Sequence, residues 1–385
     1  MAPAEAPAPA ARTELARTHL ARLAAEPRPA GSDAEARARA HCAATLRALG
    51  FGVAERPFAY SAFPGRYGTA AGGVTSIGAL ATAALCGWRG APGTALAVLV
   101  AAGAVLAAAG LWMARRGVLD APVARARGVN LEATRGGDAP RLWLVAHLDS
   151  KSQPVPIAGR AAGVVGSAAA WVAALALAVA QLAGVVGGGW WPWVGAIGVV
   201  AGIPVAASVV GARSAGAVDN ASGAAAVLVA AAFLPADASV GVLLTSAEEL
   251  GLAGARAWAA TRDRGGVALN CDGVDDAGRV TCMYTGRPPR RVLGAAAGAA
   301  AALRAPAPRP RRLLPGILTD GVALADRGWE VATLSKGTLR TLARIHTSRD
   351  SLDALRGEGV TEVGALIAAM ARHLLGSTEP GRAGD

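Results

Sequence analysis

Charged side chains are absent from long stretches of this sequence. Residues 161–212 form a run of 52 positions without Asp, Glu, Lys or Arg, and shorter charge-free windows cover residues 67–88 and 93–114. Because a helix of about 20 apolar residues spans the hydrocarbon core of a bilayer, these windows predict four transmembrane helices in two hairpins. Ala/Gly-rich helices buried in a soluble core are the alternative, and the length of the windows favours the membrane.

Cysteines and targeting signals are also scarce. The four cysteines have no spacing typical of a zinc finger, and they are too few to make a disulfide framework in 385 residues. Residues 1–12 are rich in Pro and Ala and have no apolar segment after a basic start. We therefore expect no cleavable secretory signal, so that membrane insertion depends on the internal helices.

Lysine is nearly absent, since the chain has only Lys151 and Lys336 among its 38 basic residues. The net charge of +11 is therefore carried by arginine, which indicates a compositional bias first and membrane topology second. The most basic segment, residues 304–312, has no interleaved aromatic residues and is expected to be an exposed Pro-rich loop. We expect no nucleic-acid partner.

The remaining residues, about 290, have the size of a single α/β domain. Strand-like and helix-like segments alternate along them. Strands are expected at residues 53–60, 128–134, 141–146, 240–245, 267–270 and 331–334, and helices within 13–49 with a break at 27–32, at 222–234 and at 252–261. This alternation predicts an α/β fold with a mostly parallel sheet flanked by helices, whose ligands bind at the carboxyl ends of the strands.

The predicted organisation is one catalytic domain interrupted twice. Its three parts are residues 1–66, 115–160 and 213–385, and the two transmembrane hairpins are residues 67–114 and 161–212.

Acidic and imidazole side chains occur where the predicted strands end or a helix begins. In chain order they are His147 and Asp149, Asp219, Glu248 and Glu249, Asp272, and His346. Histidine and carboxylate ligands suit Zn²⁺, and two ions about 4 Å apart need a carboxylate that binds both. Each motif alone has an ordinary explanation, such as a structural histidine or a solvated Glu pair at a helix start. Together and in this order they predict a two-metal site.

The order of these motifs resembles that of peptidase family M28, a family of zinc peptidases that includes aminopeptidases. Three further segments resemble the family's motifs. Residues 27–32 (PRPAGS) resemble its R-x-x-G-S segment, and Asn130 with Gly136 and Gly137 resembles the strand and turn before its first histidine. His346, Thr347 and Asp350 resemble its closing H-T-x-x-D. The resemblance covers nearly all of the chain outside the hairpins.

The resemblance implies a zinc-aminopeptidase-like fold and assigns a role to each site residue. His147 and Asp272 would bind one zinc ion, Glu249 and His346 the other, and Asp219 both. The same resemblance implies that Glu248 is the general base and that Asp149 orients His147.

Two departures from the family pattern concern residues near the site. Ile345 stands where many relatives have a tyrosine, and Thr319, Asp320 and Gly321 stand where relatives have S-D-H. Both bear on substrate choice and rate. The separation of 72 positions between His147 and Asp219, which is a short loop in ordinary relatives, is a third difference.

The predicted function is that of a membrane-anchored di-zinc aminopeptidase that acts on peptides through an activated water and Glu248. Alternatives are an M20-like carboxypeptidase or deacylase, a glutaminyl-cyclase-like enzyme and a non-catalytic receptor or scaffold. The 74 positions from Asp272 to His346 leave no room for the M20 lid domain, and cyclase-like relatives use one zinc without need of His147. The oligomeric state stays open.

Arginines flank the hairpins mainly on the side of the catalytic domain, while the opposite turns contain Arg89 and a Trp-rich stretch at residues 187–193. Excess arginine marks the cytoplasmic side of a membrane, and tryptophan suits its interface. We therefore expect a multi-pass protein of the cell membrane whose catalytic domain faces the cytoplasm, with the lipid bilayer as its second partner.

Overall fold

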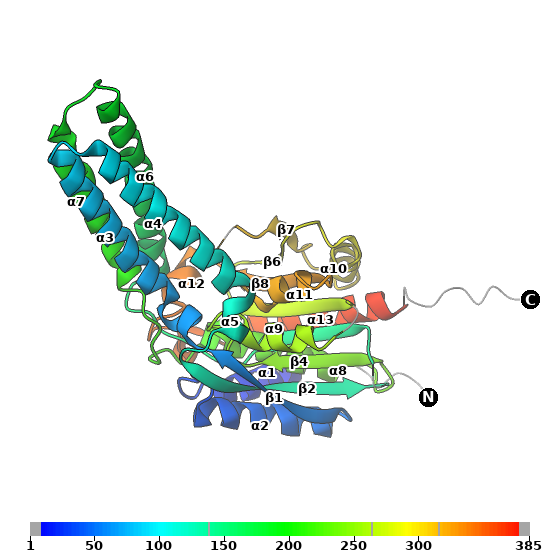
Figure 1. The fold of residues 1–385 in the computed structure, drawn as a ribbon. Helices are drawn as coiled ribbons and strands as arrows, with labels where there is room; N and C mark the ends of the chain where they lie inside the picture. The colour runs from blue at the N-terminus through cyan, green and yellow to red at the C-terminus, as the bar shows by residue number, and fades with distance from the viewer. Residues whose placement is uncertain (1–8, 138, 263–264, 315, 377–385) are drawn as a thin grey trace, which may run out of the picture. The chain divides into compact units, whose positions relative to one another are not determined.

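A computed structural model describes residues 9–137, 139–262, 265–314 and 316–376 (Figure 1). The chain folds into two compact units. The α/β unit comprises Met1–Tyr60, Ala126–Ser152 and Ala212–Asp385, and the helical unit comprises Ser61–Arg125 and Gln153–Gly211. Residues 1–8, part of the stretch in which no secretory signal is expected, lie outside the described residues.

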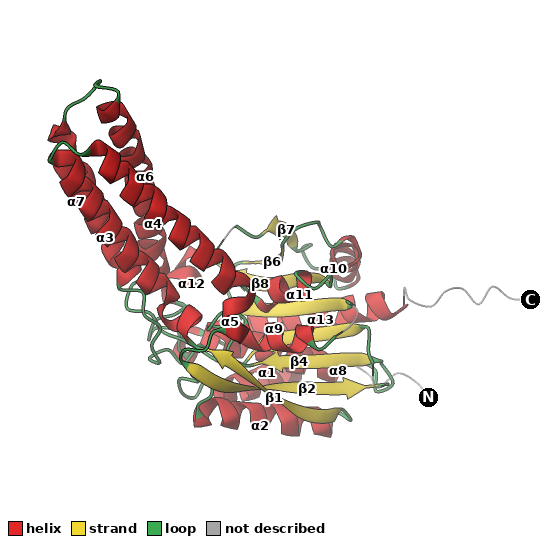
Figure 2. Cartoon of the chain, in the orientation of Figure 1, coloured by secondary structure: helices red, strands yellow, loops and turns green. Residues whose placement is uncertain are grey.

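An eight-stranded sheet forms the centre of the α/β unit, with the order β1-β2-β4-β3-β5-β8-β6-β7 (Figure 2). The strands are β1 (Gly52–Ser61), β2 (Arg125–Arg135), β3 (Leu142–His147), β4 (Val240–Thr245), β5 (Val267–Val274), β6 (Arg279–Tyr284), β7 (Arg309–Arg312) and β8 (Glu330–Gly337). The central strands β4, β3, β5 and β8 are parallel, while β2 and β6 run antiparallel to their inner neighbours. The expected α/β sheet flanked by helices is confirmed, with its parallel part in the middle.

Helices cover both faces of this sheet. On one face, α8 (Gly223–Phe233) and α13 (Glu358–Gly376) contact the central strands, and α1 (Pro9–Leu23), α2 (Asp33–Ala48) and α10 (Arg290–Ala302) pack against these two helices. On the other face lie α9 (Ala253–Ala260) and α11 (Asp320–Ala325). The short α12 (Leu339–Arg344) follows β8.

The side chains of β3 alternate between the two faces, as a strand buried on both sides requires. Leu142, Leu144 and Ala146 belong to the larger core beneath α8 and α13. Trp143 and Val145 belong to a smaller core with aromatic residues of the α9 side. This burial on both faces explains why β3 is apolar along its whole length until it ends at a histidine.

The expectation of a loop at residues 304–312 is wrong for its second half. Residues Arg309–Arg312 form β7, an edge strand whose side chains are all exposed. Pro310 is compatible with this position because an edge strand leaves one row of backbone groups unpaired. Strand β5 is also longer than expected, so that Asp272 lies inside the strand instead of following it.

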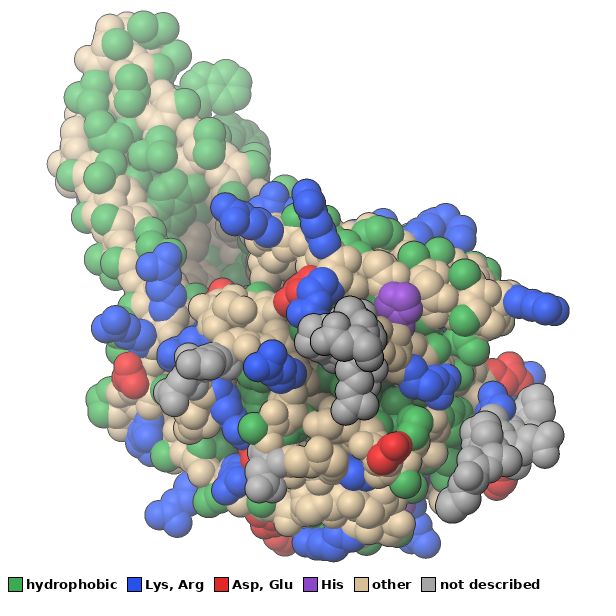
Figure 3. Space-filling view, turned by 90° about the vertical axis from the view of Figure 1, so that its right-hand side faces the viewer, with side chains coloured by type: hydrophobic (Ala, Val, Ile, Leu, Met, Phe, Trp, Pro, Cys, Tyr) green, Lys and Arg blue, Asp and Glu red, His purple; other side chains and the backbone are tan. Residues whose placement is uncertain are grey.

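The helical unit contains four helices that are long and apolar enough to cross a membrane. They include α3 (Thr69–Trp88), α4 (Pro92–Trp112), α6 (Ile157–Leu182) and α7 (Trp191–Ala206), with α5 (Val118–Asp120) after α4. Large apolar side chains point outward on these helices, for example Val105, Val165 and Val200, each more than 60% exposed. Hydrophobic side chains dominate the face of the long helices drawn in Figure 3. An outer surface of this kind suits lipid better than water.

A partly buried polar contact joins three helices inside the helical unit. The indole of Trp191, which is fully buried, donates a hydrogen bond to Gln181 at 2.6 Å, and the amide of Gln181 donates one to the carbonyl of Gly87 at 3.0 Å. A Cβ atom at Gly87 would lie 2.0 Å from the Trp191 ring. The close approach of α3 and α7 therefore depends on the missing side chain at this position.

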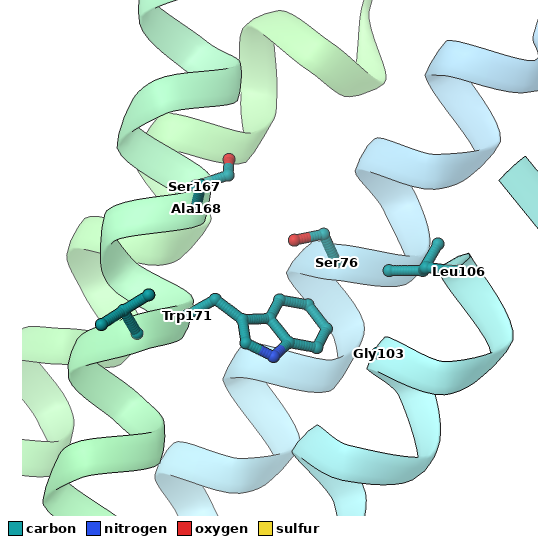
Figure 4. Close-up of a pocket in the computed structure, with 7 residues that line it drawn as sticks. Ser76, Gly103, Leu106, Ser167, Ala168 and Trp171 are labelled. Carbon is teal, nitrogen blue, oxygen red and sulfur yellow. The ribbon is translucent and has the colours of Figure 1, made fainter. Parts of the chain in front are cut away.

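A shallow groove of about 350 Å³ runs between α3, α4 and α6. Ser76 of α3, Gly103 and Leu106 of α4, and Ser167 of α6 line it, and Trp171 of α6 points into it (Figure 4).

We expect Gly87→Val to destabilise the helical unit, because the new side chain overlaps the Trp191 ring and breaks its contact with Gln181. Overpacking of this kind costs about 1 to 3 kcal/mol. The thermal unfolding midpoint in detergent should fall. Gly78→Val in the same helix is the matched control, since a Cβ at Gly78 has nothing within 4 Å. Equal midpoints for the two variants would contradict this account of the packing.

Candidate metal centre

The site begins at His147, the last residue of β3. The register aligns Val145 with Asn270 of β5, so that His147 and Asp272 lie level at the same edge of the sheet. The Nε2 atom of His147 is 3.6 Å from Asp272 Oδ1 and 3.2 Å from Asp219 Oδ1. This nitrogen is buried and has no hydrogen-bond partner among the described residues. It therefore faces carboxylates in the manner of an atom that binds a metal.

Asp219 lies between the two expected ligand histidines. It belongs to the irregular segment Ala217–Ser222 that leads into α8. Its Oδ1 is 3.2 Å from His147 Nε2, and its Oδ2 is 2.9 Å from His346 Nε2. The carboxylate of Asp350 holds this segment by accepting hydrogen bonds from the backbone N–H groups of Val218 and Asp219 at 2.7 and 3.1 Å. The two oxygens of one carboxylate thus point to two imidazoles.

Glu248 and Glu249 follow β4 in a tight turn that Asp149 organises. The two oxygens of Asp149 accept hydrogen bonds from the backbone N–H groups of Glu248 and Glu249 at 3.0 and 3.1 Å. The nearest polar atom to Nδ1 of His147 is the backbone carbonyl of Asp149, at 3.0 Å, while its Oδ1 is 3.6 Å away. Asp149 therefore orients His147 mainly through its carbonyl, and its carboxylate places the two glutamates.

The carboxylate of Glu249 has a different neighbour at each oxygen. Its Oε1 is buried, lies 3.4 Å from His346 Nε2 and accepts no hydrogen bond from the described residues. Its Oε2 is 2.5 Å from Nζ of Lys151. Lys151 was absent from the residues expected in the site. The available signal was its rarity, since it is one of two lysines in the chain and directly follows the H-x-D-S motif.

Arg28 connects the early R-x-x-G-S segment to this site. Its guanidinium is almost fully buried and donates to the carbonyls of Leu148 at 2.8 Å, Ala215 at 2.6 Å and Gly216 at 3.1 Å. One side chain thereby holds the loop after His147 to the loop before Asp219. The arginine of the motif is thus structural.

Two groups of side chains have the composition and spacing of metal ligands. One contains His147, Glu248 and Asp272, and the other contains Asp219, Glu249 and His346; within each group the nearest ligand atoms all lie within 4.8 Å of one another. Imidazole and carboxylate donors suit zinc. Each group contains one buried ligand atom that has no hydrogen-bond partner among the described residues, Nε2 of His147 in the first and Oε1 of Glu249 in the second. The residues present therefore fit a zinc site.

The burial of so many acidic groups changes their pKa values in opposite directions. Burial and the charges of Glu249 and Asp272 raise the pKa of Glu248 well above its usual value, although His147 opposes them. Burial also favours a raised pKa for Asp219, but contacts with His147 and His346 outweigh it and hold this pKa well below its usual value. Asp219 therefore stays ionised, while Glu248 is poised to carry a proton.

Asp320, in the segment that departs from the family pattern, is also buried beside the site. It accepts a hydrogen bond of 2.5 Å from the hydroxyl of Thr245, the last residue of β4. Burial raises the pKa of Asp320 to about 7. The aspartate of this motif contacts a strand end instead of an expected metal ligand.

Comparisons with known proteins show a family match for part of the chain and a shared fold. Residues 202–371 match the family model described as peptidase family M28. A zinc aminopeptidase from Bacillus subtilis has a similar structure, with a TM-score of 0.54 and 14% identity over 93% of this chain and 94% of that chain. An aminopeptidase from Aneurinibacillus sp. strain AM-1 gives 0.54 and 16% over 93% and 92%, and a glutaminyl cyclase from Porphyromonas gingivalis gives 0.53 and 14% over 96% and 99%. None of the curated proteins compared matches the chain. At these identities the similarity shows a shared fold.

The family match begins inside α7, near the end of the second hairpin. It includes Asp219 and His346 but excludes His147 and Asp149, which precede the hairpin. The charge-free run of 52 residues separates the first histidine motif from the rest of the family pattern. The contact between His147 and Asp219 brings the first histidine motif next to the matched segment in space.

Glu35 is a buried carboxyl group beneath the site that the sequence did not single out. It lies in the first turn of α2, where its Oε2 accepts a hydrogen bond of 2.7 Å from the N–H of Gly31. Glu35 is only 1% exposed. Burial, together with the charge of Asp149, raises its pKa from 4.5 to about 7.

We expect the protein to lose stability as the pH rises through this range, because ionised Glu35 is unfavourable in the folded state. The contribution is fully present below pH 4.5 and is lost as the pH rises through about 7. Glu35→Gln cannot ionise, so its loss of unfolding free energy between pH 5 and pH 8 should be smaller by an amount on the order of 2 kcal/mol. Its thermal midpoint should therefore fall less over this range. Glu26→Gln, an exposed glutamate, is the control. An unchanged pH dependence in Glu35→Gln would refute this assignment.

Proposed function

We propose that the chain is a membrane-anchored di-zinc aminopeptidase, because residues 202–371 match the model of peptidase family M28. The observation that carries this proposal is the position of the Asp219 carboxylate, which has one oxygen next to Nε2 of His147 and the other next to Nε2 of His346. A carboxylate that binds two ions is the feature that distinguishes a two-metal site from two separate sites. The membrane anchor rests on the four long apolar helices.

In this proposal the ligands divide into two sets that share Asp219. His147 and Asp272 hold one zinc ion, and Glu249 and His346 hold the other. When bound, the two ions supply Lewis acidity that polarises a carbonyl oxygen and makes a water molecule acidic near neutral pH. Asp149 and Asp350 keep the ligands in place, since each accepts two backbone hydrogen bonds from the turns that carry them.

Glu248 is the proposed general base. Its nearest ion-pair contact is with His147 Nε2 at 3.9 Å, longer than the other carboxylate contacts of that nitrogen. Its raised pKa suits a group that takes a proton from water and returns it to the leaving amine. Glu248 also has the spacing of a ligand to the first ion, so base and ligand are the two roles that an experiment must separate.

The test is Glu248→Gln, which keeps the shape of the side chain and removes the base. Hydrolysis of aminoacyl amides should fall by about 10²-fold to 10⁴-fold, the usual contribution of a general base, while the zinc content measured by elemental analysis stays the same. Glu55→Gln, an exposed glutamate on β1, is the control and should behave as the wild type. Unchanged turnover would exclude Glu248 as the base, and loss of zinc would make it a ligand.

The aminopeptidase assignment is tested by the same measurements on paired peptides. Peptides with a free N-terminus should be shortened from that end, whereas the same peptides with an acetylated N-terminus should remain intact. A peptide that begins with glutamine examines the cyclase alternative, which the similarity to glutaminyl cyclases motivates. Loss of ammonia without hydrolysis would favour that alternative, and cleavage of acetylated peptides would exclude an aminopeptidase.

We further propose that the two hairpins at residues 67–114 and 161–212 cross the cell membrane and that the three catalytic segments share the cytoplasmic side. Arg89 lies at the turn between α3 and α4. The other arginines of the helical unit flank the helix ends that connect to the α/β unit; they are Arg66, Arg115, Arg116, Arg125 and Arg160. Excess arginine favours the cytoplasm.

Reporter fusions test this orientation. A reporter that is active only outside the cytoplasm should work when fused at Gly188, in the turn before α7, and should be inactive at the C-terminus, because the two positions are expected on opposite sides. The reverse pattern would invert the orientation. Washing membranes with high salt is the control for anchoring, since release by salt alone would contradict membrane-spanning helices.

A further inference from the structure

The two proposed ligand sets are chemically alike except for one cation. Each has its own histidine and its own carboxylate, and both share Asp219. Asp272, the carboxylate of the first set, makes an ion-pair contact with His147. Glu249, the carboxylate of the second set, is paired with Lys151. In the described part of the chain, no lysine or arginine lies within ion-pair distance of Asp219 or Asp272.

The geometry at Glu249 leaves one oxygen for a metal. Nζ of Lys151 is 2.5 Å from Oε2, while Oε1 faces His346 Nε2 at 3.4 Å. The side chains of Glu249 and Lys151 are 4% and 17% exposed. The backbone N–H of Glu249 donates a hydrogen bond to Asp149 at 3.1 Å, which holds the turn that carries this side chain. Lys151 therefore occupies the oxygen that a zinc ion would need for binding through both oxygens of the carboxylate.

We propose that Lys151 is a positioning residue that makes the site of Asp219, Glu249 and His346 the weaker of the two zinc sites. The inference rests on the proposed di-zinc function. Two effects of Lys151 act in the same direction. Its ammonium group takes one oxygen of Glu249, and its charge repels a second cation in a place where water screens little. With Asp219 counted in both sets, the first set has two negative charges, and Lys151 reduces the second set to one.

The consequence is an ordered occupancy. The site of His147 and Asp272 fills at low zinc concentration, and the site of Glu249 and His346 fills only when the zinc concentration is higher. The lysine stem is long and flexible, so the ammonium group can swing aside when the second ion binds. Zinc supply thereby sets the fraction of molecules that carry both ions.

The experiment compares stepwise zinc affinities of the detergent-purified full chain. Zinc is removed with a chelator, and binding is then followed by equilibrium dialysis with elemental analysis and by calorimetry against a competing chelator. The wild type should bind two ions with separated dissociation constants. Lys151→Met keeps a long stem and removes the charge, so the second ion should bind about 10-fold to 100-fold more tightly, the range that residues contacting metal ligands produce. The first dissociation constant should change much less, because Lys151 pairs directly with Glu249 and only its longer-range charge acts on Glu248 and Asp219.

Three further variants make the result specific. Lys151→Arg keeps the charge and should leave the second site weak. Lys151→Gln repeats the loss of charge should the methionine variant fold poorly. Lys336→Met removes the other lysine of the chain, which pairs with Glu362 at 2.6 Å, and should change neither dissociation constant.

The outcomes separate this inference from the function on which it rests. If Lys151→Met and Lys151→Gln bind the second ion as weakly as the wild type, or if both dissociation constants change by the same factor, Lys151 does not set the order. If neither the wild type nor any variant binds zinc, the di-zinc function itself is wrong. If the wild type binds two ions with equal affinity, the di-zinc function stands and the proposed asymmetry fails.

Discussion

The burial of several carboxylates in one small volume is the constraint on which the rest of the site depends. Asp149, Asp219, Glu248, Glu249 and Asp320 are each at most 9% exposed. A buried carboxylate without partners is strongly unfavourable, so each needs a compensating group or a proton. Backbone N–H groups serve Asp149, imidazoles serve Asp219, Lys151 serves Glu249, and raised pKa values mark Glu248 and Asp320. Two zinc ions would supply the positive charge that this arrangement still lacks.

The side chains that lie together at this site could be predicted from the sequence because their position follows from strand geometry. The carboxyl ends of parallel strands meet at one edge of the sheet, so rare polar residues at those ends must lie close together. The apolar strands β3 and β4 both end at polar residues of the site, β3 at His147 and β4 just before Glu248. The register then brings Asp272 level with His147 even though the end of β5 was misjudged by several residues.

Other features of the site could not be predicted, because they depend on contacts between distant segments. The family resemblance implied that Asp149 orients His147, whereas the carboxylate of Asp149 accepts hydrogen bonds from the backbone of the turn after β4. The role of Lys151 depends on which oxygen of Glu249 faces it. The strand β7 consists of arginines and a proline, which have no strand pattern, and it forms only because β6 offers a partner.

The same contacts explain how a long insertion can enter an active-site loop. On both sides of the second hairpin, the α/β unit closes the loop with its own hydrogen bonds, from Ser150 Oγ to the carbonyl of Ser214 and from the N–H of Arg213 to Ser152 Oγ, both at 2.9 Å. Arg28 adds further bonds to the carbonyls on either side. The inserted chain therefore has to leave and return at neighbouring points, which two packed antiparallel helices do by construction. Because the positions of His147 and Asp219 are set by bonds outside the insertion, 72 positions of sequence separate them without separating their side chains in space.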